Sequence, residues 1–209
     1  ARAIVVLDLM YHKIQPLDLE LVIVTRITDF MTTIAKYIYR HRNGHPPPDI
    51  PAKEGTRFFH DVLNHENPVA PDNLPVSSPD DIALLQYTGG VTGLSKGAEL
   101  LHRNLTANVQ QLIRWFSPAE RIEGFLAALP LFHVFGMTVT QNICLAVGGC
   151  MVLVPDPRNM SVLLTLLRKK RPTVITLVPA FVRKLLEHCD AKDFTSTRFV
   201  ICGGAALPY

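Results

Sequence analysis

The sequence predicts an α/β fold in which a mostly parallel sheet carries helices on both faces. Short apolar runs rich in β-branched residues alternate with stretches whose apolar residues recur at helical spacing, most regularly after Asp80. Glycine or proline residues end several of these runs, as expected for connections. Strands that alternate with helices form parallel sheets with right-handed crossovers, so we expect this arrangement along most of the chain.

The composition is that of a soluble globular protein. The 209 residues are 48% hydrophobic and 19% charged, which suits one domain or two small ones with a real core. The formal net charge of +3 is too small to indicate nucleic-acid binding. The four cysteines show no Cys-x-x-Cys pair and no zinc spacing, so we expect reduced thiols in a cytoplasmic protein. No secretory signal is expected, because the apolar run after Arg2 ends at Asp8.

Residues 1–66 are expected to form the end of a first α/β subdomain. Ile4–Leu7 and Leu21–Val24 are short, apolar and rich in β-branched residues, which is typical of buried strands. Thr56–Leu63 has apolar residues at helical spacing and predicts a short amphipathic helix. Residues 67–79 are rich in proline and predict an extended linker.

A basic stretch lies between Lys36 and His45. It combines Lys36, Arg40 and Arg42 with histidines and tyrosines. A cationic and aromatic stretch of this kind suits a membrane surface or an anionic partner. A solvated helix end explains the stretch more simply, and the membrane alternative stays open.

Residues 80–209 are expected to form an α/β subdomain that is truncated at its C-terminal end, because strands and helices alternate regularly here. The expected strands are Ile82–Tyr87, Phe125–Leu129, Met151–Val154, Thr173–Leu177 and Arg198–Cys202. The expected helices are Asn104–Phe116, Gly136–Val147, Met160–Leu167 and one that begins at Pro179. The cations at residues 168–171 suit the negative end of a helix dipole, so no partner is expected for them.

Residues 125–155 contain no aspartate, glutamate, lysine or arginine, which raises a membrane interpretation. A spanning helix needs about 20 mostly apolar residues. Here Pro130, Gly136 and the pair Gly148-Gly149 interrupt the run. A buried helix followed by a buried strand is the better explanation, and peripheral attachment to a bilayer stays open.

The functional prediction depends on the glycine-rich segment Tyr87–Gly97. Its glycines allow a turn whose backbone N–H groups point inward and bind an anion. Thr88 and Thr92 add hydroxyl donors, and Lys96 adds a positive charge that suits phosphate. The spacing fits neither the Walker loop nor the dinucleotide-binding fingerprint. We expect a phosphate-binding loop, with a glycine-rich hairpin turn that binds no ligand as the alternative.

Two further unusual segments follow predicted strands, namely Leu129–Gly136 and Gly203–Pro208. Ligands of open α/β sheets bind outside the carboxyl ends of the strands. Taken singly these are weak signals, because a lone His133 is more often structural and Gly203-Gly204 is more often a plain turn. Their shared placement with the glycine-rich segment favours one common site.

The segment YTGGVTGLSKGAELLHRNL, from Tyr87 to Leu105, resembles the signature of the AMP-forming acyl-CoA synthetase and adenylating-enzyme superfamily. The loop, its lysine and the triplet His102-Arg103-Asn104 match that signature in register. The stretches PLFHVFGM and GGAALP resemble later blocks of the same family in the right order. PLFHVFGM and Val154–Arg158 look most like the long-chain fatty acid branch. The resemblance implies the incomplete N-terminal domain of an acyl-adenylate-forming enzyme.

The resemblance implies an ATP-dependent fatty acid–CoA ligase that forms acyl-AMP, releases pyrophosphate and transfers the acyl group to coenzyme A. Its partners would be small molecules: fatty acid, ATP and coenzyme A, with Mg²⁺ bound mainly by residues beyond Tyr209 and no metal ligand in this chain. The residues implied to bind the nucleotide are Thr88, Gly89, Gly90, Val91, Thr92, Gly93, Lys96, Gly203, Gly204 and Ala205. Those implied to bind the acyl substrate are His133, Phe135 and Gly136, and those implied in catalysis are Lys96, Thr92 and His133.

The segment departs from the family pattern at three positions. Val91 replaces a threonine and removes a hydroxyl donor, and Ser95 replaces a proline. Leu101 replaces a threonine before His102, which removes a helix cap worth about 1 kcal/mol. These changes keep a degenerate nucleotide-binding relative as an alternative, beside an acyl-AMP ligase or adenylation domain that loads a carrier protein. Because the family's later elements lie beyond Tyr209, the chain alone is expected to be inactive.

Overall fold

The computed structural model describes residues 2–43, 48–64, 70, 72, 74–88, 96–120 and 122–207. The chain divides into two compact units, Ala1–Pro75 and Val76–Tyr209, which we describe separately. Among the described residues, one three-stranded and one four-stranded sheet are entirely parallel, and one two-stranded sheet is antiparallel. The predicted α/β fold with a mostly parallel sheet is therefore confirmed.

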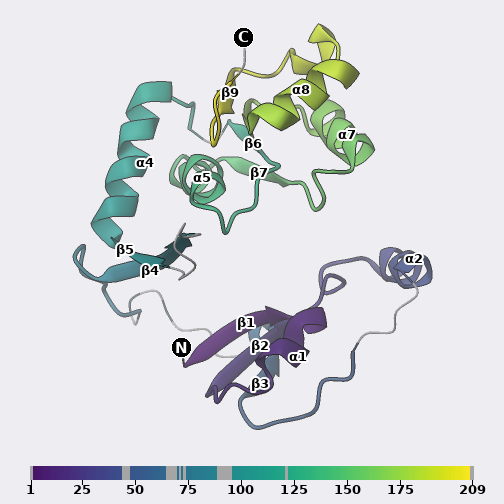
Figure 1. Cartoon of the computed structure of the whole chain (residues 1–209), viewed down its shortest axis with the longest axis vertical. Helices are drawn as coiled ribbons and strands as arrows, with labels where there is room; N and C mark the ends of the chain where they lie inside the picture. The colour runs from purple at the N-terminus through teal and green to yellow at the C-terminus, as the bar shows by residue number, and fades with distance from the viewer. Residues whose placement is uncertain are drawn as a thin grey trace. The chain divides into compact units, whose positions relative to one another are not determined.

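The first unit contains a small parallel sheet (Figure 1). Its strands, in spatial order, are β1 (Ala3–Leu7), β2 (Leu21–Thr25) and β3 (Thr56–Phe58). Val24 is fully buried at the centre, with Val6 and Tyr11 in the same cluster. The two predicted strands are present, but their predicted burial is wrong, because β1 and β2 each bury one residue, as in a sheet covered mainly on one face.

The helices of the first unit are short, apart from one. They are α1 (Tyr11–Ile14), α2 (Thr33–Asn43) and α3 (Phe59–Leu63). The helix predicted over Thr56–Leu63 is correct only in its second half, because its first three residues pair with β2 as strand β3. The basic stretch lies on α2 as far as Asn43, and His45 lies outside the described residues. So does part of the predicted linker, residues 67–79.

The second unit is built on four parallel strands. In spatial order they are β7 (Cys150–Leu153), β6 (Gly124–Ala127), β8 (Val174–Leu177) and β9 (Phe199–Cys202). All four were predicted at nearly these bounds. β6 and β8 are central, and all four residues of β8 are buried. Such strands carry near-continuous apolar sequence because both faces are covered.

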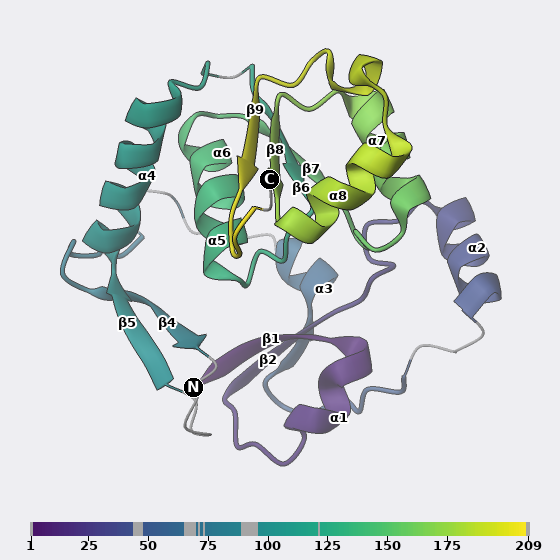
Figure 2. The same ribbon diagram turned by 45° about the horizontal axis from the view of Figure 1, so that its top comes forward.

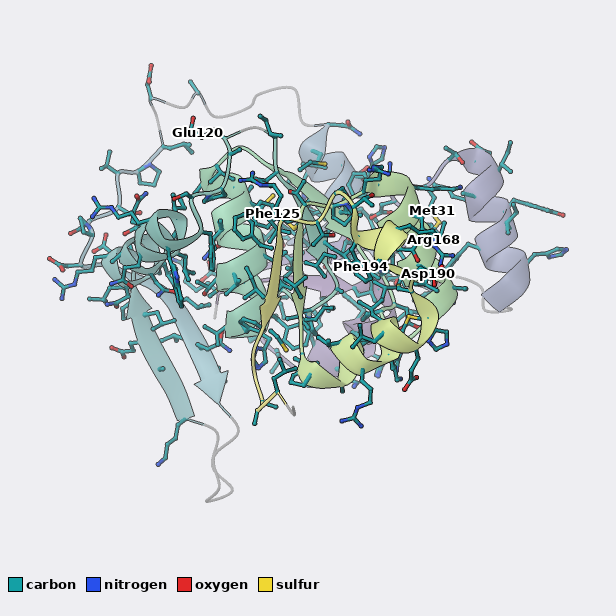
Figure 3. All side chains as sticks on the ribbon, turned by 90° about the horizontal axis from the view of Figure 1, so that it is seen from above. Met31, Glu120, Phe125, Arg168, Asp190 and Phe194 are labelled. Atoms are coloured by element: carbon teal, nitrogen blue, oxygen red, sulfur yellow. The ribbon has the colours of Figure 1, made fainter. Side chains whose placement is uncertain are left out.

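Helices cover both faces of this sheet (Figure 2). One face carries α4 (His102–Phe116), α5 (Val134–Gly136) and α6 (Ile143–Ala146). The other carries α7 (Met160–Lys170) and α8 (Pro179–His188). Phe125 of β6 (Figure 3) packs on the first face, and its neighbour Leu126 packs on the second. This alternation is what a strand between two helical layers requires.

The uncharged stretch 125–155 is only partly buried, because Phe132, Leu145 and Leu153 are exposed. α5, a π-helical turn at Met137–Asn142 and α6 follow one another without a break, which confirms the predicted helix over Gly136–Val147. Gly148 follows with a positive φ of 63°, as expected for a helix C-terminus. In the part of the chain that the structure describes, every helix is too short or too polar to cross a membrane.

The sequence prediction missed one strand of the second unit, β5 (Lys96–Leu101). β4 (Ile82–Thr88) pairs with β5 (Lys96–Leu101) as an antiparallel hairpin, whereas the prediction placed β4 in the parallel sheet and assigned no strand after the glycine-rich segment. Strands joined by a short connection can pair directly only in the antiparallel sense. The sequence KGAELL contains lysine, glycine and glutamate, which are depleted in strands, so its strand signal is weak.

Two of the cations at the end of α7, Arg168 and Arg171, bond within the chain, which the sequence did not predict. Arg168 donates two hydrogen bonds to the carboxylate of Asp193, at 2.9 and 3.0 Å. Arg171 donates to the hydroxyl of Thr195 at 3.2 Å. The Arg168 guanidinium holds the pKa of the Asp193 carboxyl below its usual value. These contacts fix the end of α7 beside the short turn Ala191–Phe194 (Figure 3).

The four cysteines are free thiols. Cys144 is buried under α4, and burial raises its pKa to about 11. A thiol with such a pKa stays protonated at neutral pH, so Cys144 behaves as a small apolar core residue.

A buried carboxylate ties the amino ends of three strands together. Glu123, at 1% exposure, accepts hydrogen bonds from the N–H of Ala119, the hydroxyl of Thr173 and the guanidinium of Arg198. Thr173 in turn accepts the N–H of Gly124 at 2.9 Å. Glu123, Thr173 and Arg198 directly precede β6, β8 and β9. The cluster therefore sets the register of these strands at their amino ends.

We expect Glu123→Gln to lower the free energy of unfolding by about 1.5–3 kcal/mol, because it weakens charge-assisted hydrogen bonds to a buried acceptor. Urea unfolding of the 209-residue chain measures this change. Asp156→Asn is the matched control, since its ion pair with Arg158 is exposed and local, and such pairs contribute only about 0–1 kcal/mol. Equal losses for the two variants would contradict the assigned role of Glu123.

Candidate functional site

The β4–β5 hairpin holds the two ends of the glycine-rich segment together. In its ladder Thr88 stands opposite Lys96, and Tyr87 stands opposite Gly97. A Cβ at Gly97 would lie 3.5 Å from the Tyr87 ring, so the ring covers this glycine. Lys96 therefore lies where the segment rejoins the hairpin. Most of the predicted loop residues lie outside the described residues, namely Gly89, Gly90, Val91, Thr92 and Gly93.

The triplet His102-Arg103-Asn104 fastens the first turn of α4 to the chain before β4. The N–H groups of His102 and Arg103 donate to the carbonyls of Asp81 and Pro79, at 3.1 and 3.0 Å. Arg103 also forms an ion pair with Asp80. These contacts place the hairpin at the start of α4, whose far end packs in the core of the sheet.

Asn104 supplies half of a capping box. Its side-chain oxygen accepts the N–H of Leu101, the N-cap residue, at 2.9 Å. The Leu101 side chain makes no cap hydrogen bond, as its replacement of a threonine predicts. The sequence prediction missed the role of Asn104, although an acceptor three residues after the N-cap is the known signal for it.

The second predicted group lies at the carboxyl edge of the parallel sheet, where β6 ends and the chain turns into α5. His133 is the N-cap residue of α5, and its Nδ1 accepts the N–H of Phe135 at 3.2 Å. Its backbone N–H donates to the carbonyl of Pro130 at 3.1 Å. An Nδ1 that accepts assigns the ring proton to Nε2. The exposed imidazole of His133 thus presents an Nε2–H donor at this edge.

Gly203 brings the end of β9 against α5. Its N–H donates to the carbonyl of Leu177 at 3.2 Å, which continues the β8–β9 ladder by one residue. A Cβ at Gly203 would lie 2.9 Å from the ring of Phe135, closer than side chains pack. Only a glycine leaves room for the ring here.

Gly136 permits a second close approach, within the turn that follows β6. A Cβ at this position would lie 2.5 Å from the carbonyl oxygen of Pro130. The obstacle is backbone, which cannot move aside as a flexible side chain can. The absence of a side chain at Gly136 therefore lets α5 start directly beneath the end of β6.

The structure thus brings His133, Phe135, Gly136 and Gly203 to one edge of the sheet. Gly204, with a φ of 81°, and the exposed Ala205 follow Gly203 in the same turn. Neither Leu129–Gly136 nor Gly203–Leu207 contains an aspartate or glutamate. An edge with an imidazole N–H donor, an aromatic ring and no carboxylate suits an anionic ligand with an apolar or aromatic part.

An apolar pocket elsewhere in the second unit lacks the features of a ligand site. This pocket of about 190 Å³ lies between α8 and the sheet, but its lining supplies no converging polar groups, which a ligand site needs. It is lined by Ile175, Leu177, Val182, Leu185, Leu186, Phe194 and Val200. In the described part of the chain, no group of three or more histidines, cysteines and acids is arranged to hold a metal ion.

Comparison with known protein families shows to which family this chain belongs. The family model of AMP-binding enzymes matches residues 21–209. The chain belongs to the AMP-binding enzyme family. Its relatives include the long-chain-fatty-acid–CoA ligase of Bacillus subtilis, which is 37% identical over 141 residues, 65% of this chain and 25% of that protein. The ligase of the same name from Salmonella typhimurium is 29% identical over 222 residues, which cover this whole chain and 38% of that protein.

These matches confirm the resemblance predicted from Tyr87–Leu105, in both superfamily and branch. The AMP-binding chain therefore spans between a quarter and two fifths of the length of these two relatives.

Solved structures agree with the fold of this AMP-binding enzyme. ATP-bound MatB from Rhodopseudomonas palustris superposes with a TM-score of 0.64 at 24% identity, covering 94% of this chain and 37% of that one. The inhibitor-bound N-terminal domain of FACL13 from Mycobacterium tuberculosis gives a TM-score of 0.63 at 20% identity, covering 99% and 51%. At these identities the likeness concerns the fold.

We expect Gly203→Ala to lower the free energy of unfolding by about 1–3 kcal/mol, because the new methyl group overpacks against Phe135. Phe135→Leu should relieve part of this loss, so a double-mutant cycle in urea should show coupling between the two positions. Gly97→Ala is the matched control, since its methyl group would meet the Tyr87 ring at an ordinary 3.5 Å. Additive effects at Gly203 and Phe135 would refute the contact.

Proposed function

We propose that this chain is the part of an ATP-dependent fatty acid–CoA ligase that holds the phosphates of ATP and one side of the acyl-adenylate. The pairing of Thr88 with Lys96 carries the proposal, because it closes the glycine-rich segment and puts a lysine at its end. A cation beside such a segment suits a polyphosphate. The membership of the AMP-binding family supports the same ligand.

In the proposed reaction, a carboxylate oxygen of the fatty acid attacks the α-phosphorus of ATP. The bond from that phosphorus to the pyrophosphate oxygen breaks, which gives acyl-AMP and pyrophosphate. The thiol of coenzyme A then attacks the acyl carbon, loses its proton, and AMP leaves. The leaving pyrophosphate gains negative charge in the first step, so fixed donors at its β- and γ-phosphates accelerate it.

We assign this charge stabilisation to Lys96 and to the segment Thr88–Gly93. Lys96 interacts with phosphate as a point charge, and Thr88, Thr92 and the backbone N–H groups of Gly89, Gly90, Val91 and Gly93 donate hydrogen bonds. Thr92 and Lys96 act on the reacting phosphates, which makes them the catalytic residues of this group.

The carboxyl edge of the parallel sheet is assigned to the adenylate and the acyl group. The Nε2–H of His133 would donate to an oxygen of the adenylate, because its Nδ1 is already occupied by Phe135. Phe135 and Gly136 would form the wall on the acyl side. Gly203, Gly204 and Ala205 would pack against the adenine, since they leave room for a flat ring.

Mg²⁺ would shield the charge of the phosphates when it is bound. The described residues hold no group of acids arranged for a metal ion, and the assigned segments contain no carboxylate. From the resemblance to this family, we propose that the main protein ligand of Mg²⁺ lies beyond Tyr209. We further propose that the enzyme works in the cytoplasm, at or near a membrane surface, where its apolar substrate accumulates.

Exchange of labelled pyrophosphate into ATP tests the first half-reaction. We expect fatty-acid-dependent exchange with the full-length protein and none above background with the 209-residue chain, because the chain spans only 38% of a full-length relative. In the full-length protein, Lys96→Gln should lower exchange by about 10²–10³-fold, the usual loss for one donor to a developing charge. Lys170→Gln, at the exposed end of α7, is the control and should change nothing.

Other outcomes would point to the alternatives. Exchange by the isolated chain would overturn the assignment of essential groups beyond Tyr209. ATP binding without exchange in the full-length protein would indicate a degenerate relative. Transfer to a phosphopantetheine carrier protein, with none to coenzyme A, would indicate an acyl-AMP ligase or a carrier-loading adenylation domain.

Val91→Thr, made in the full-length protein, should strengthen ATP binding. The added hydroxyl supplies a hydrogen bond to a charged group, worth about 1.5–3 kcal/mol when well placed. The KM for ATP in the exchange assay, or direct titration of ATP, measures the effect. Val91→Ala is the matched control, because it changes the side chain without adding a donor. An unchanged ATP affinity would contradict the missing-donor interpretation of Val91.

A further inference from the structure

Helix α2, Thr33–Asn43, turns its apolar side outward. Ile34 is 74% exposed, Tyr37 is 66% exposed and Ile38 is 48% exposed. Residues three and four apart lie on the same face of a helix, so these side chains form one apolar strip. The Tyr37 ring also contacts the ring of His41, one turn further along, with 5.2 Å between the ring centroids and 37° between the ring planes.

The side of α2 opposite to this apolar strip is less exposed than the strip itself. Ala35, Lys36 and Tyr39 are half-buried, and they lie on the side opposite to Ile34 and Ile38. A helix that packs on its own domain shows the reverse order, with the apolar stripe against the core. An outward apolar strip of this kind marks a surface that meets another apolar phase.

The charge of α2 indicates what kind of apolar surface the strip contacts. The helix contains Lys36, Arg40 and Arg42 and no aspartate or glutamate. A helix that combines an exposed apolar strip with basic residues and no acidic ones is the pattern of helices that lie in the interface of a bilayer. Lysine and arginine near an anionic leaflet are attracted to it, whereas a protein groove would need acidic residues to match them.

We propose that α2 binds the surface of a bilayer that contains anionic lipids. Ile34, Tyr37 and Ile38 enter the boundary between headgroups and acyl chains, and the positive charge of the helix attracts it to the anionic leaflet. The half-buried stem of Lys36 suits this arrangement, since a lysine can lay its methylenes along apolar surface and keep its ammonium in water. Binding of this kind does not require ATP, coenzyme A or catalysis.

Vesicle flotation of the 209-residue chain tests the proposal. We expect the chain to float with vesicles of phosphatidylcholine and phosphatidylglycerol, to float far less with phosphatidylcholine alone, and to dissociate at high salt. Ile34→Ser/Ile38→Ser and Lys36→Glu/Arg40→Glu should each weaken partitioning by at least about tenfold. Equal binding to both kinds of vesicle, or none to either, would overturn the proposal.

Two control variants match these changes elsewhere on the chain. Leu186→Ser removes an apolar side chain that is 72% exposed on α8, and Lys169→Glu/Lys170→Glu reverses two exposed cations at the end of α7. Neither should change flotation. A loss of binding as large as that of the α2 variants would show a general charge or solubility effect and would refute the assignment to α2.

A tryptophan placed on the strip reports insertion directly. The chain has a single tryptophan, Trp115, which is 81% exposed on α4, so Trp115→Phe provides a silent background. Tyr37→Trp in that background should shift its emission to the blue with anionic vesicles and should be quenched by brominated acyl chains, because the strip lies about 5–10 Å deep. Flotation without either change would mean that α2 stays outside the bilayer, which contradicts the proposal.

Discussion

The second unit depends on one constraint: β6 and β8 are covered on both faces. Phe125 and Leu126 point to opposite helical layers, and Ile175 is fully buried between its neighbours. Burial of both faces requires helices on each side. Because the strands are parallel, every connection after β6 returns from the carboxyl ends of the strands to their amino ends, and the helices lie in these connections. The Glu123 cluster satisfies the polar groups at one edge. The turns that follow the strands lie at the opposite, carboxyl ends of the sheet.

The turns at that edge are crowded because the helical layers begin there directly. α5 starts beneath the end of β6, which requires Gly136 beside the carbonyl of Pro130. β9 ends against the Phe135 ring, which requires Gly203. The same crowding fixes His133 as the cap of α5 and directs its remaining N–H donor outward. The residues that this packing requires are thus also the ones that we propose for the adenylate and the acyl group.

Much of the parallel sheet could be predicted from the sequence, and the structure shows why. The strands of the parallel sheet were found because burial on both faces makes them continuously apolar, as in Phe125–Leu129 and Thr173–Leu177. β5 was missed because Lys96–Leu101 is an exposed hairpin strand, stabilised by pairing with β4 rather than by burial. The Glu123–Arg198 pair was missed because it joins residues 75 apart, which no local pattern reveals. The Gly203–Phe135 contact escaped prediction for the same reason.

The hairpin also explains how the glycine-rich segment tolerates its departures from the family pattern. A flexible loop must lose conformational entropy to close around a ligand, and a serine in place of a proline at residue 95 increases that loss. Pairing Thr88 with Lys96 in the β4–β5 ladder already joins the two ends of the segment, so part of this conformational entropy is lost when the chain folds. The contacts of Arg103 with Asp80 and Pro79 anchor that ladder to α4 and so to the core. Pairing at the ends of the segment therefore lowers the conformational entropy that the proposed ATP-bound state still has to lose.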